Sequence, residues 1–182
     1  MCGRYEAYIS PDEEGKRIKE RAEQLNLTYS EGEIFPSDEV LCFIPYESDV
    51  DLASMKWGIK TKGLHINARI ESINDKAMYK NMKNNRCAVI ANAFYEWDKN
   101  KRKYLIKTKD KYFYLACIFN DANELLIITK QADESISHIH SRMPIIMNKN
   151  EMIEYIHNKD NRVSNKELII KEVNEQLSLF WF

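Results

Sequence analysis

The sequence predicts an α+β fold in which a mixed, largely antiparallel or barrel-like sheet is flanked by a few helices. The chain has 182 residues, of which 44% are hydrophobic, and this is enough for one substantial core but little for two. Short segments rich in β-branched and aromatic residues gather in the middle of the chain. They do not alternate strictly with helical segments, as the strands of a parallel doubly wound sheet would. We therefore expect residues 1–182 to form a single domain.

The first helix signal is a capping box near the N-terminus. Ser10 fits the N-cap, with Pro11 at the first helical position and Glu13 at the third. The helix should end near Asn26. Its expected apolar face consists of Ile18, Ala22 and Leu25.

Two further helices and five strands are expected. Between Ser72 and Met82 apolar residues recur at helical spacing, and residues 148–151 repeat the capping-box pattern before another apolar stretch. The predicted strands are Glu39 to Ile44, Arg86 to Ala91, Tyr104 to Lys107, Tyr112 to Phe119 and Leu125 to Thr129.

Composition excludes several classes of protein. A net charge of -1 rules out a uniformly basic nucleic-acid coat, so any phosphate contact must come from a local group of cations. The four cysteines form no CxxC pair, which argues against a zinc site and a disulfide scaffold. We expect no metal, no cofactor and a reducing cytoplasm. No segment approaches the roughly 18 apolar residues of a membrane span, and no export signal or anchor is expected.

The first chemical signal is the N-terminal sequence Met1-Cys2-Gly3-Arg4. Removal of Met1 would leave Cys2 with an amine and a thiol on neighbouring carbons, a pair that closes a thiazolidine ring on an aldehyde. With pKa values of about 7.7 to 8.0 and about 8.5, a fraction of each group is nucleophilic at pH 7. The alternative is that Met1 stays and Cys2 is a small buried residue.

Three later segments support the first reading. They are His65 to Glu71 (His-Ile-Asn-Ala-Arg-Ile-Glu), Phe94 to Trp97 (Phe-Tyr-Glu-Trp) and Ile139 to Pro144 (Ile-His-Ser-Arg-Met-Pro). Together with the N-terminal sequence, in this order, they resemble the SOS-response-associated peptidase (SRAP) family. The resemblance runs from Cys2 to about Met147.

The resemblance implies a protein of the DNA damage response that binds single-stranded DNA and crosslinks covalently and reversibly to abasic sites. Cys2 would be the nucleophile, in lyase-like chemistry with possible self-removal of Met1. Glu96 and His140 would move protons, and Asn67 would orient the reacting groups. The alternatives are an outward-facing strand residue for Glu96, a turn residue for Asn67 and a structural histidine for His140.

The resemblance also implies five DNA contacts. Arg4 and Arg69 would bind phosphates, because guanidinium pairs with phosphate oxygens in a fork; salt bridges are the alternative. Trp57 and Pro36 would pack against bases, where stacking contributes about 1 to 3 kcal/mol, although both also suit a core. Thr129 would lie near a substrate phosphate, although β-branched residues suit strands anyway. The basic run from Lys99 to Lys111 is expected to be a solvated hairpin loop.

The chain departs from the family pattern at several places. Ala93 stands where glycine is usual, which would strain the backbone if that position needs a positive φ. Ser141 replaces a usual Asp and removes a possible partner of His140. Only nine residues separate Trp57 from Asn67, and the chain ends soon after residue 174, so we expect no partner-recruiting tail. Separately, we expect a monomer.

Two rival functions remain open. An N-terminal-nucleophile hydrolase would use the Cys2 amine as the base for its thiol, but this explains the N-terminal sequence alone. A non-catalytic single-stranded DNA-binding module would be favoured if Met1 stayed in place.

Overall fold

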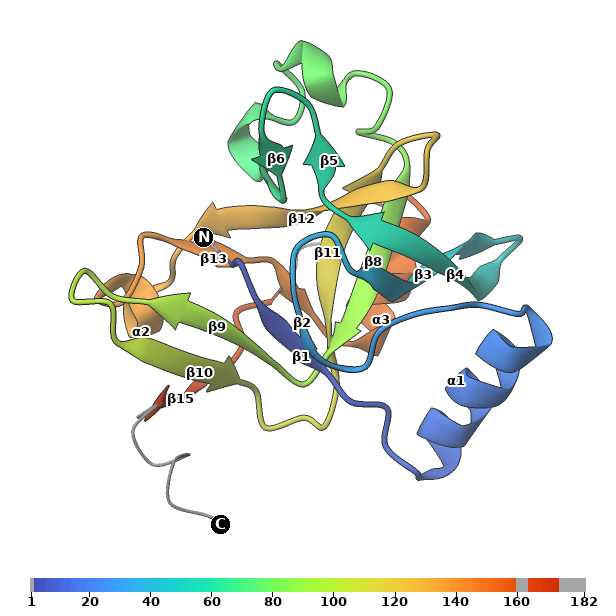
Figure 1. The fold of residues 1–182 in the computed structure, drawn as a ribbon, viewed down its shortest axis with the longest axis horizontal. Coiled ribbons are helices and arrows are strands. Elements are labelled where there is room, and N and C mark those ends of the chain that lie inside the picture. Colours follow the sequence, from blue (N-terminus) through green and yellow to red (C-terminus); the bar gives the residue numbers. More distant parts are fainter. Residues whose placement is uncertain (1, 160–163, 174–182) are drawn as a thin grey trace.

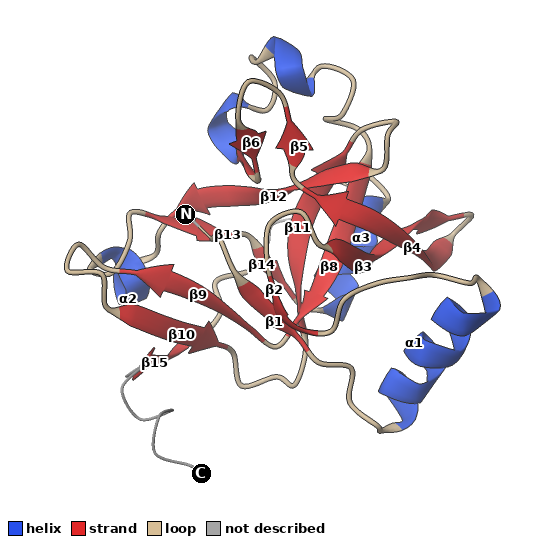
Figure 2. Ribbon diagram, in the orientation of Figure 1, coloured by secondary structure: helices blue, strands red, loops and turns tan. Residues whose placement is uncertain are grey.

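A computed structural model describes residues 2–159 and 164–173 of the chain (Figure 1). Helices are few in this part of the chain, and strands are the more common regular structure (Figure 2). They are α1 (Glu13–Gln24), α2 (Glu134–Ser137), α3 (Lys149–Ile156) and the 3₁₀ turns η1 (Ile70–Ser72) and η2 (Ala77–Tyr79). None of these helices is long and apolar enough to cross a membrane.

The described strands form two large sheets and a small hairpin. One sheet has five strands in the order β15-β10-β9-β1-β2. Its members are β1 (Tyr5–Ala7), β2 (Gly32–Ile34), β9 (Ala93–Trp97), β10 (Lys103–Lys107) and β15 (Ile169–Val173). The hairpin pairs β5 (Ile59–Lys60) with β6 (Leu64–His65).

The second sheet has eight strands and closes on itself. They are β3 (Glu39–Tyr46), β4 (Asp49–Trp57), β7 (Asn67–Arg69), β8 (Arg86–Ala91), β11 (Phe113–Phe119), β12 (Glu124–Gln131), β13 (Arg142–Pro144) and β14 (Ile146–Met147). Because β12 pairs with both β4 and β11, the circuit β12-β4-β3-β8-β11 is closed. Within this sheet β12 runs parallel to β4 and β7, and the other pairs are antiparallel. The predicted α+β fold with a barrel-like, largely antiparallel sheet is confirmed.

The core has two parts because successive side chains of a strand point to opposite faces. On β3, Leu41 and Phe43 pack with buried residues of α1 and α3, such as Ile18 and Met152. The alternate residues of the same strands pack with the five-stranded sheet. This second cluster includes Val40, Cys42, Val89, Leu115, Tyr5 and Phe94. Cys2 belongs to it, so the N-terminal sequence is fixed between the two sheets.

All five predicted strands are present, with boundaries within one or two residues. The predicted capping box of α3 is also confirmed, since Asn148 and Glu151 cap each other's backbone N–H groups. The other described strands, among them the long β4, and the short α2 were not predicted.

Two helix predictions are wrong in detail. The N-cap of α1 is Asp12 rather than Ser10, because the Asp12 side chain accepts from Gly15 N at 2.9 Å. The predicted helix between Ser72 and Met82 is replaced by the turns η1 and η2. Lys76 is extended there, with φ -80° and ψ 126°, and this separates the two turns.

The substitution of Ala93 for the usual glycine causes no strain. Ala93 begins β9, pairs with Glu6, and is not among the residues with positive φ. The segment that carries Glu96 therefore adopts a regular strand.

Candidate functional site

Cys2 lies three residues before the first residue of β1 and is fully buried. Its Sγ lies 3.7 Å from the Arg4 carbonyl oxygen, to which the thiol donates a weak hydrogen bond. Burial raises the pKa of the Cys2 thiol, and the nearby charge of Glu96 raises it further. The thiol is therefore held in its neutral form at pH 7.

Asn67 holds Cys2 directly. Its Nδ2 donates to the Cys2 carbonyl oxygen at 2.9 Å. The side chain is positioned by β7, which runs parallel to β12 with Asn67 opposite Ile127. Oδ1 of Asn67 is buried and has no hydrogen-bond partner within residues 2–159 and 164–173. The site thus keeps an unused acceptor beside Cys2.

Glu96 is the buried carboxylate of the site, with 1% of its surface exposed. It lies on β9 on the same face as Phe94, since residues two apart in a strand share a face. Burial raises the pKa of Glu96 to about 7. The alternative of an outward-facing strand residue is wrong, and a carboxyl with this pKa exchanges protons readily near neutral pH.

His140 follows α2, and its neighbours Ile139 and Met143 belong to the same core cluster as Cys2. Nδ1 of His140 lies 3.0 Å from the backbone nitrogen of Arg142 and 3.2 Å from its carbonyl oxygen, so the backbone of Arg142 positions the ring. Burial lowers the pKa of His140 and favours the neutral form of the ring. Ser141 is exposed, so backbone hydrogen bonding from Arg142 orients the ring where the family often has an Asp.

The two arginines predicted to bind phosphate differ in their contacts. Arg4 Nη1 lies 3.2 Å from Glu33 Oε1, so the salt bridge considered as an alternative is present. The Arg4 guanidinium also lies over the ring of Phe35, 4.4 Å from its centroid. Arg69 is exposed at the end of β7, and Pro36 is half-buried beside Phe35.

Trp57 and Thr129 are not placed to touch DNA. Trp57 is fully buried, its Nε1 donates to the Ile66 carbonyl oxygen at 3.0 Å, and its ring packs edge-on against Tyr5. Thr129 is also fully buried, with Oγ1 3.4 Å from the Ala68 carbonyl oxygen. Both expected contacts are corrected for the same reason, since bases and phosphates cannot reach fully buried side chains. The core role considered for Trp57 is the one observed.

Trp57 nevertheless matters for the geometry of the site. Its two partners are Tyr5, three residues after Cys2, and Ile66, the residue before Asn67. One indole therefore fixes the two segments that meet in the hydrogen bond between Asn67 and Cys2.

Sequence reasoning missed the exposed aromatic surface beside Arg4. Phe35 is 42% exposed, although only its neighbour Pro36 was predicted to meet DNA. Trp97 and Lys103 also lie there, with the Arg4 guanidinium 5.4 Å from the Trp97 ring centroid. The signal in the sequence was Phe35 itself, a large aromatic residue next to a proline at the end of β2.

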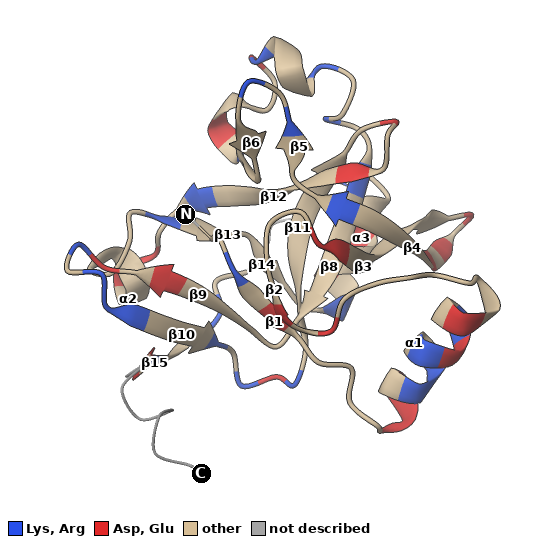
Figure 3. Cartoon of the chain, in the orientation of Figure 1, with Lys and Arg blue, Asp and Glu red and all other residues tan. Residues whose placement is uncertain are grey.

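The basic run forms the predicted hairpin loop only before residue 103, where the chain turns between β9 and β10. From Lys103 to Lys107 it is strand β10, and the Lys103 side chain is only 11% exposed, so the expected solvated loop is wrong for this part. Arg102 pairs with Asp98 at 2.7 Å, and Lys109 pairs with Glu167 at 2.6 Å. Over the described chain, basic and acidic residues are interspersed (Figure 3). Within the same residues there is no group of three or more His, Cys, Asp or Glu that could hold a metal ion.

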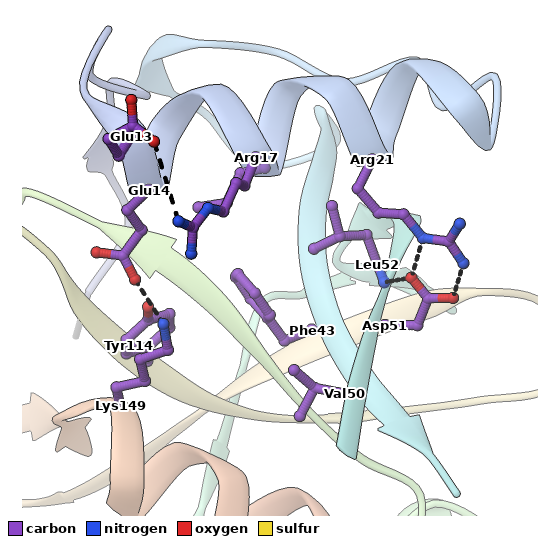
Figure 4. Close-up of a pocket in the computed structure, with 11 residues that line it drawn as sticks. Glu13, Glu14, Arg17, Arg21, Phe43, Val50, Asp51, Leu52, Tyr114 and Lys149 are labelled. Carbon is purple, nitrogen blue, oxygen red and sulfur yellow. Dashed lines mark hydrogen bonds and ion pairs between the residues drawn. The ribbon is translucent and has the colours of Figure 1, made fainter.

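A cleft of about 580 Å³ lies elsewhere, between α1 and the β3–β4 hairpin (Figure 4). Its floor is apolar, with Phe43 and Leu52, and charged pairs such as Glu14 and Lys149 line its rim. None of its lining residues was predicted as a site residue, and none belongs to the group around Cys2.

Comparison with known proteins gives a consistent result. A family model described as SOS response associated peptidase (SRAP) matches residues 1–180. The abasic site processing protein YoqW of Bacillus subtilis (strain 168) is 30% identical over 177 residues, covering 81% of this chain and 76% of that protein. The abasic site processing protein HMCES of Xenopus tropicalis is 24% identical over 216 residues, covering 84% and 64%. A solved structure from Bacteroides thetaiotaomicron has a TM-score of 0.73 at 15% identity, covers 98% of this chain and 94% of its own, and is similar in fold.

Proposed function

The chain belongs to the SOS-response-associated peptidase family, and from this premise we propose that it processes abasic sites in single-stranded DNA through a covalent bond to Cys2. The observation that carries the proposal is the arrangement around this residue. Asn67 Nδ2 donates a hydrogen bond to the Cys2 carbonyl oxygen at 2.9 Å. The buried Glu96 has a pKa of about 7, and its charge helps to raise the pKa of the Cys2 thiol. The names of the curated relatives support the choice of an abasic site as substrate.

The chemistry requires a free Cys2 amine. Hydrolysis of the peptide bond between Met1 and Cys2 consumes one water and releases methionine. The amine then attacks the aldehyde carbon of the ring-opened deoxyribose and gives a carbinolamine. Loss of one water from this adduct leaves a Schiff base.

Ring closure uses the thiol. Sulfur bonds to the Schiff-base carbon, the C=N electron pair moves to nitrogen, and the thiol proton is transferred to that nitrogen, so that a thiazolidine forms. Because burial keeps the Cys2 thiol neutral, a base must remove its proton as sulfur attacks. Glu96 suits this task, because a pKa of about 7 lets it both accept and return a proton.

His140 and Asn67 complete the site. The His140 ring, positioned by the backbone of Arg142, is suited to donate a proton to the hydroxyl that leaves as water. The unused Oδ1 of Asn67 can accept a hydrogen bond from the new amine or a sugar hydroxyl. His140 would move a proton and Asn67 would orient the reacting groups. Neither residue adds a permanent charge to the site.

DNA contacts follow from the surface around this group. Arg4 and the exposed Arg69 are the proposed phosphate-binding residues. Phe35, with Pro36 beside it, is the proposed stacking surface, because an exposed aromatic face accepts any base.

Intact mass spectrometry after mixing the protein with an abasic oligonucleotide tests the proposal. We expect a protein without Met1 and an adduct whose mass is the sum of the two partners less one water. Cys2→Ala should give no adduct stable to denaturation, and Cys42→Ala, at another buried cysteine, is the control that should retain it. If Cys2→Ala gave as much stable adduct as the wild type, the mechanism would be contradicted.

The same measurement separates the rival functions. A binding module would retain Met1 and bind DNA without any adduct. An N-terminal-nucleophile hydrolase would lose Met1 but give no adduct with abasic DNA. Neither rival explains why a buried carboxylate and a held asparagine converge on Cys2.

A further inference from the structure

Beside Cys2, one carboxylate holds two cations. Oε1 of Glu33 lies 3.2 Å from Arg4 Nη1 and 3.1 Å from Lys103 Nζ. Glu33 lies on β2, Arg4 immediately precedes β1 and Lys103 begins β10. The side chain of Glu33 is 33% exposed, whereas that of Lys103 is only 11% exposed. Solvent therefore reaches the anion more easily than the cation that it neutralises.

Aromatic rings hold the two cations independently of Glu33. The Arg4 guanidinium lies over Phe35 and Trp97, and Lys103 Nζ lies 4.2 Å from the ring centroid of Tyr95. Cation–π contacts of this kind are attractive wherever the ring face meets the charge. The cations are thus prearranged and would keep their places if the carboxylate moved away.

Arg4 retains unused hydrogen-bonding capacity. Its Nε is buried and has no hydrogen-bond partner within the part of the chain that the structure describes. Glu33 engages Nη1 only, although guanidinium can bind an oxyanion through two parallel N–H donors. A tetrahedral anion with several oxygens suits Arg4 and Lys103 together better than one carboxylate oxygen does.

We propose that Glu33 is an internal substitute for a DNA phosphate, and that a backbone phosphate next to the abasic site displaces it from Arg4 and Lys103. The inference rests on the proposed function. Arg4 is two residues from Cys2, and Trp97 follows Glu96, so a phosphate bound here lies next to the reacting sugar. Lys103 becomes a phosphate-binding residue, and Glu33 weakens the binding of DNA that carries no lesion.

A purely structural role for Glu33 makes the opposite prediction. In that case the carboxylate ties β2 to β10, and its loss weakens the fold without improving DNA binding. The surroundings include one more acid, because Glu6 lies opposite Glu33 in the β1–β2 ladder and accepts a hydrogen bond from Tyr95. Removing the Glu33 charge takes away the carboxylate that pairs with both Arg4 and Lys103, which favours an incoming phosphate.

The test measures the affinity of the whole protein for a fluorescent single-stranded oligonucleotide without a lesion, over a range of salt. Glu33→Gln should bind about threefold to fivefold more tightly at low salt, the size expected when one like charge a few ångström away is removed, and the gain should shrink as salt screens it. Lys103→Gln should weaken binding and reduce the slope of log K against log salt by about 0.7, as for one lost phosphate contact on a single strand.

Glu14→Gln is the matched control. It removes one partner of an exposed ion pair, with Lys149 at 2.8 Å, at the distant cleft of Figure 4, and should leave DNA affinity unchanged. Unchanged or weaker binding by Glu33→Gln overturns the proposal, and so does an unchanged salt slope for Lys103→Gln. If Glu33→Gln fails to fold, the Lys103→Gln slope decides alone. Wild-type protein that binds no single-stranded DNA would instead overturn the proposed function as well.

Discussion

The Cys2 site and the cleft beside α1 place charged groups in contrasting environments. In the cleft, Arg21 and Asp51 meet at 2.6 Å, and the Arg21 side chain is 45% exposed. At the site, Glu96 is 1% exposed, and its pKa is raised to about 7. The cleft has an open volume of about 580 Å³, yet its charges are paired at the surface, where such pairs contribute little.

The comparison shows that the candidate functional site is marked by side chains with shifted pKa values and not by the volume of a cavity. A large cavity is the usual first candidate for a binding site. In this molecule the Cys2 thiol and the Glu96 carboxyl, both with a pKa raised by burial, and the unused Oδ1 of Asn67 belong to the site around Cys2 instead. Three substitutions test this contrast between the buried site and the surface cleft.

The largest effect is expected for Glu96→Gln. Raising the pKa of this carboxyl from 4.5 to about 7 costs about 3 kcal/mol once it is ionised. Because the folded-state pKa is above the unfolded one, the contribution of Glu96 to stability is fully present below pH 4.5 and is lost as the pH rises through 7. At pH 8 the variant should therefore be about 3 kcal/mol more stable in urea denaturation, although crosslinking should slow by roughly 10²-fold or more.

The control for this prediction is the pH profile of the crosslinking rate. Wild type should show an inflection near pH 7 that Glu96→Gln lacks, and Glu14→Gln should reproduce the wild-type curve. If wild type and Glu96→Gln had the same free energy of unfolding at pH 8, ionisation of the buried carboxyl would not destabilise the fold.

A smaller effect is expected for Trp57→Phe. The variant keeps a ring against Tyr5 but leaves the Ile66 carbonyl without the indole donor, a loss of about 1 to 2 kcal/mol in the free energy of unfolding. Crosslinking should also slow, since Trp57 fixes the segments of both Cys2 and Asn67. Trp97→Phe, at a half-buried position, is the comparison in urea denaturation. An equal loss from both tryptophans would contradict the role of the indole hydrogen bond.

The smallest effect is expected for Asp51→Asn in the cleft. Arg21 hydrogen-bonds both Asp51 oxygens and lowers the pKa of this carboxyl, but the pair is partly exposed, so the loss should be at most about 1 kcal/mol. The folded-state pKa lies below 3.8, so the contribution is present above that pH and disappears as the pH falls through the lowered pKa. Thermal melts at pH 7 and pH 3 measure it. Any change in crosslinking rate would show that the cleft and the site are coupled.

The sequence predicted those parts of the fold that depend on local patterns. Strands such as β8 and β11 are continuous apolar segments, and the capping box of α3 is fixed by Asn148 and Glu151 alone. The prediction of a helix around Lys76 was wrong. The apolar residues of this segment have helical spacing, but they pack into the core cluster from short turns with Lys76 extended between them.

The candidate site was predictable in its members but not in their exposure. Motifs identified the residues that gather around Cys2, because the chemistry depends on residue type. They did not reveal that Trp57 and Thr129 are buried, since β-branched and aromatic residues suit both cores and DNA surfaces. The group of Arg4, Glu33 and Lys103 was missed, because its members lie in three segments separated in the sequence and meet only in the folded sheet.

The hydrogen bond from Asn67 to the Cys2 carbonyl has a practical consequence. Asn67 binds the carbonyl oxygen of residue 2. This hydrogen bond therefore does not depend on the side chain at position 2 or on a group attached to the backbone nitrogen of that residue. Precursor and processed chain, or Cys2 and its serine replacement, should sit in the same place. If the proposed function holds, a purification tag fused ahead of Cys2 and not cleaved should leave this hydrogen bond intact while it blocks the amine, and the tagged protein should form no adduct with abasic DNA.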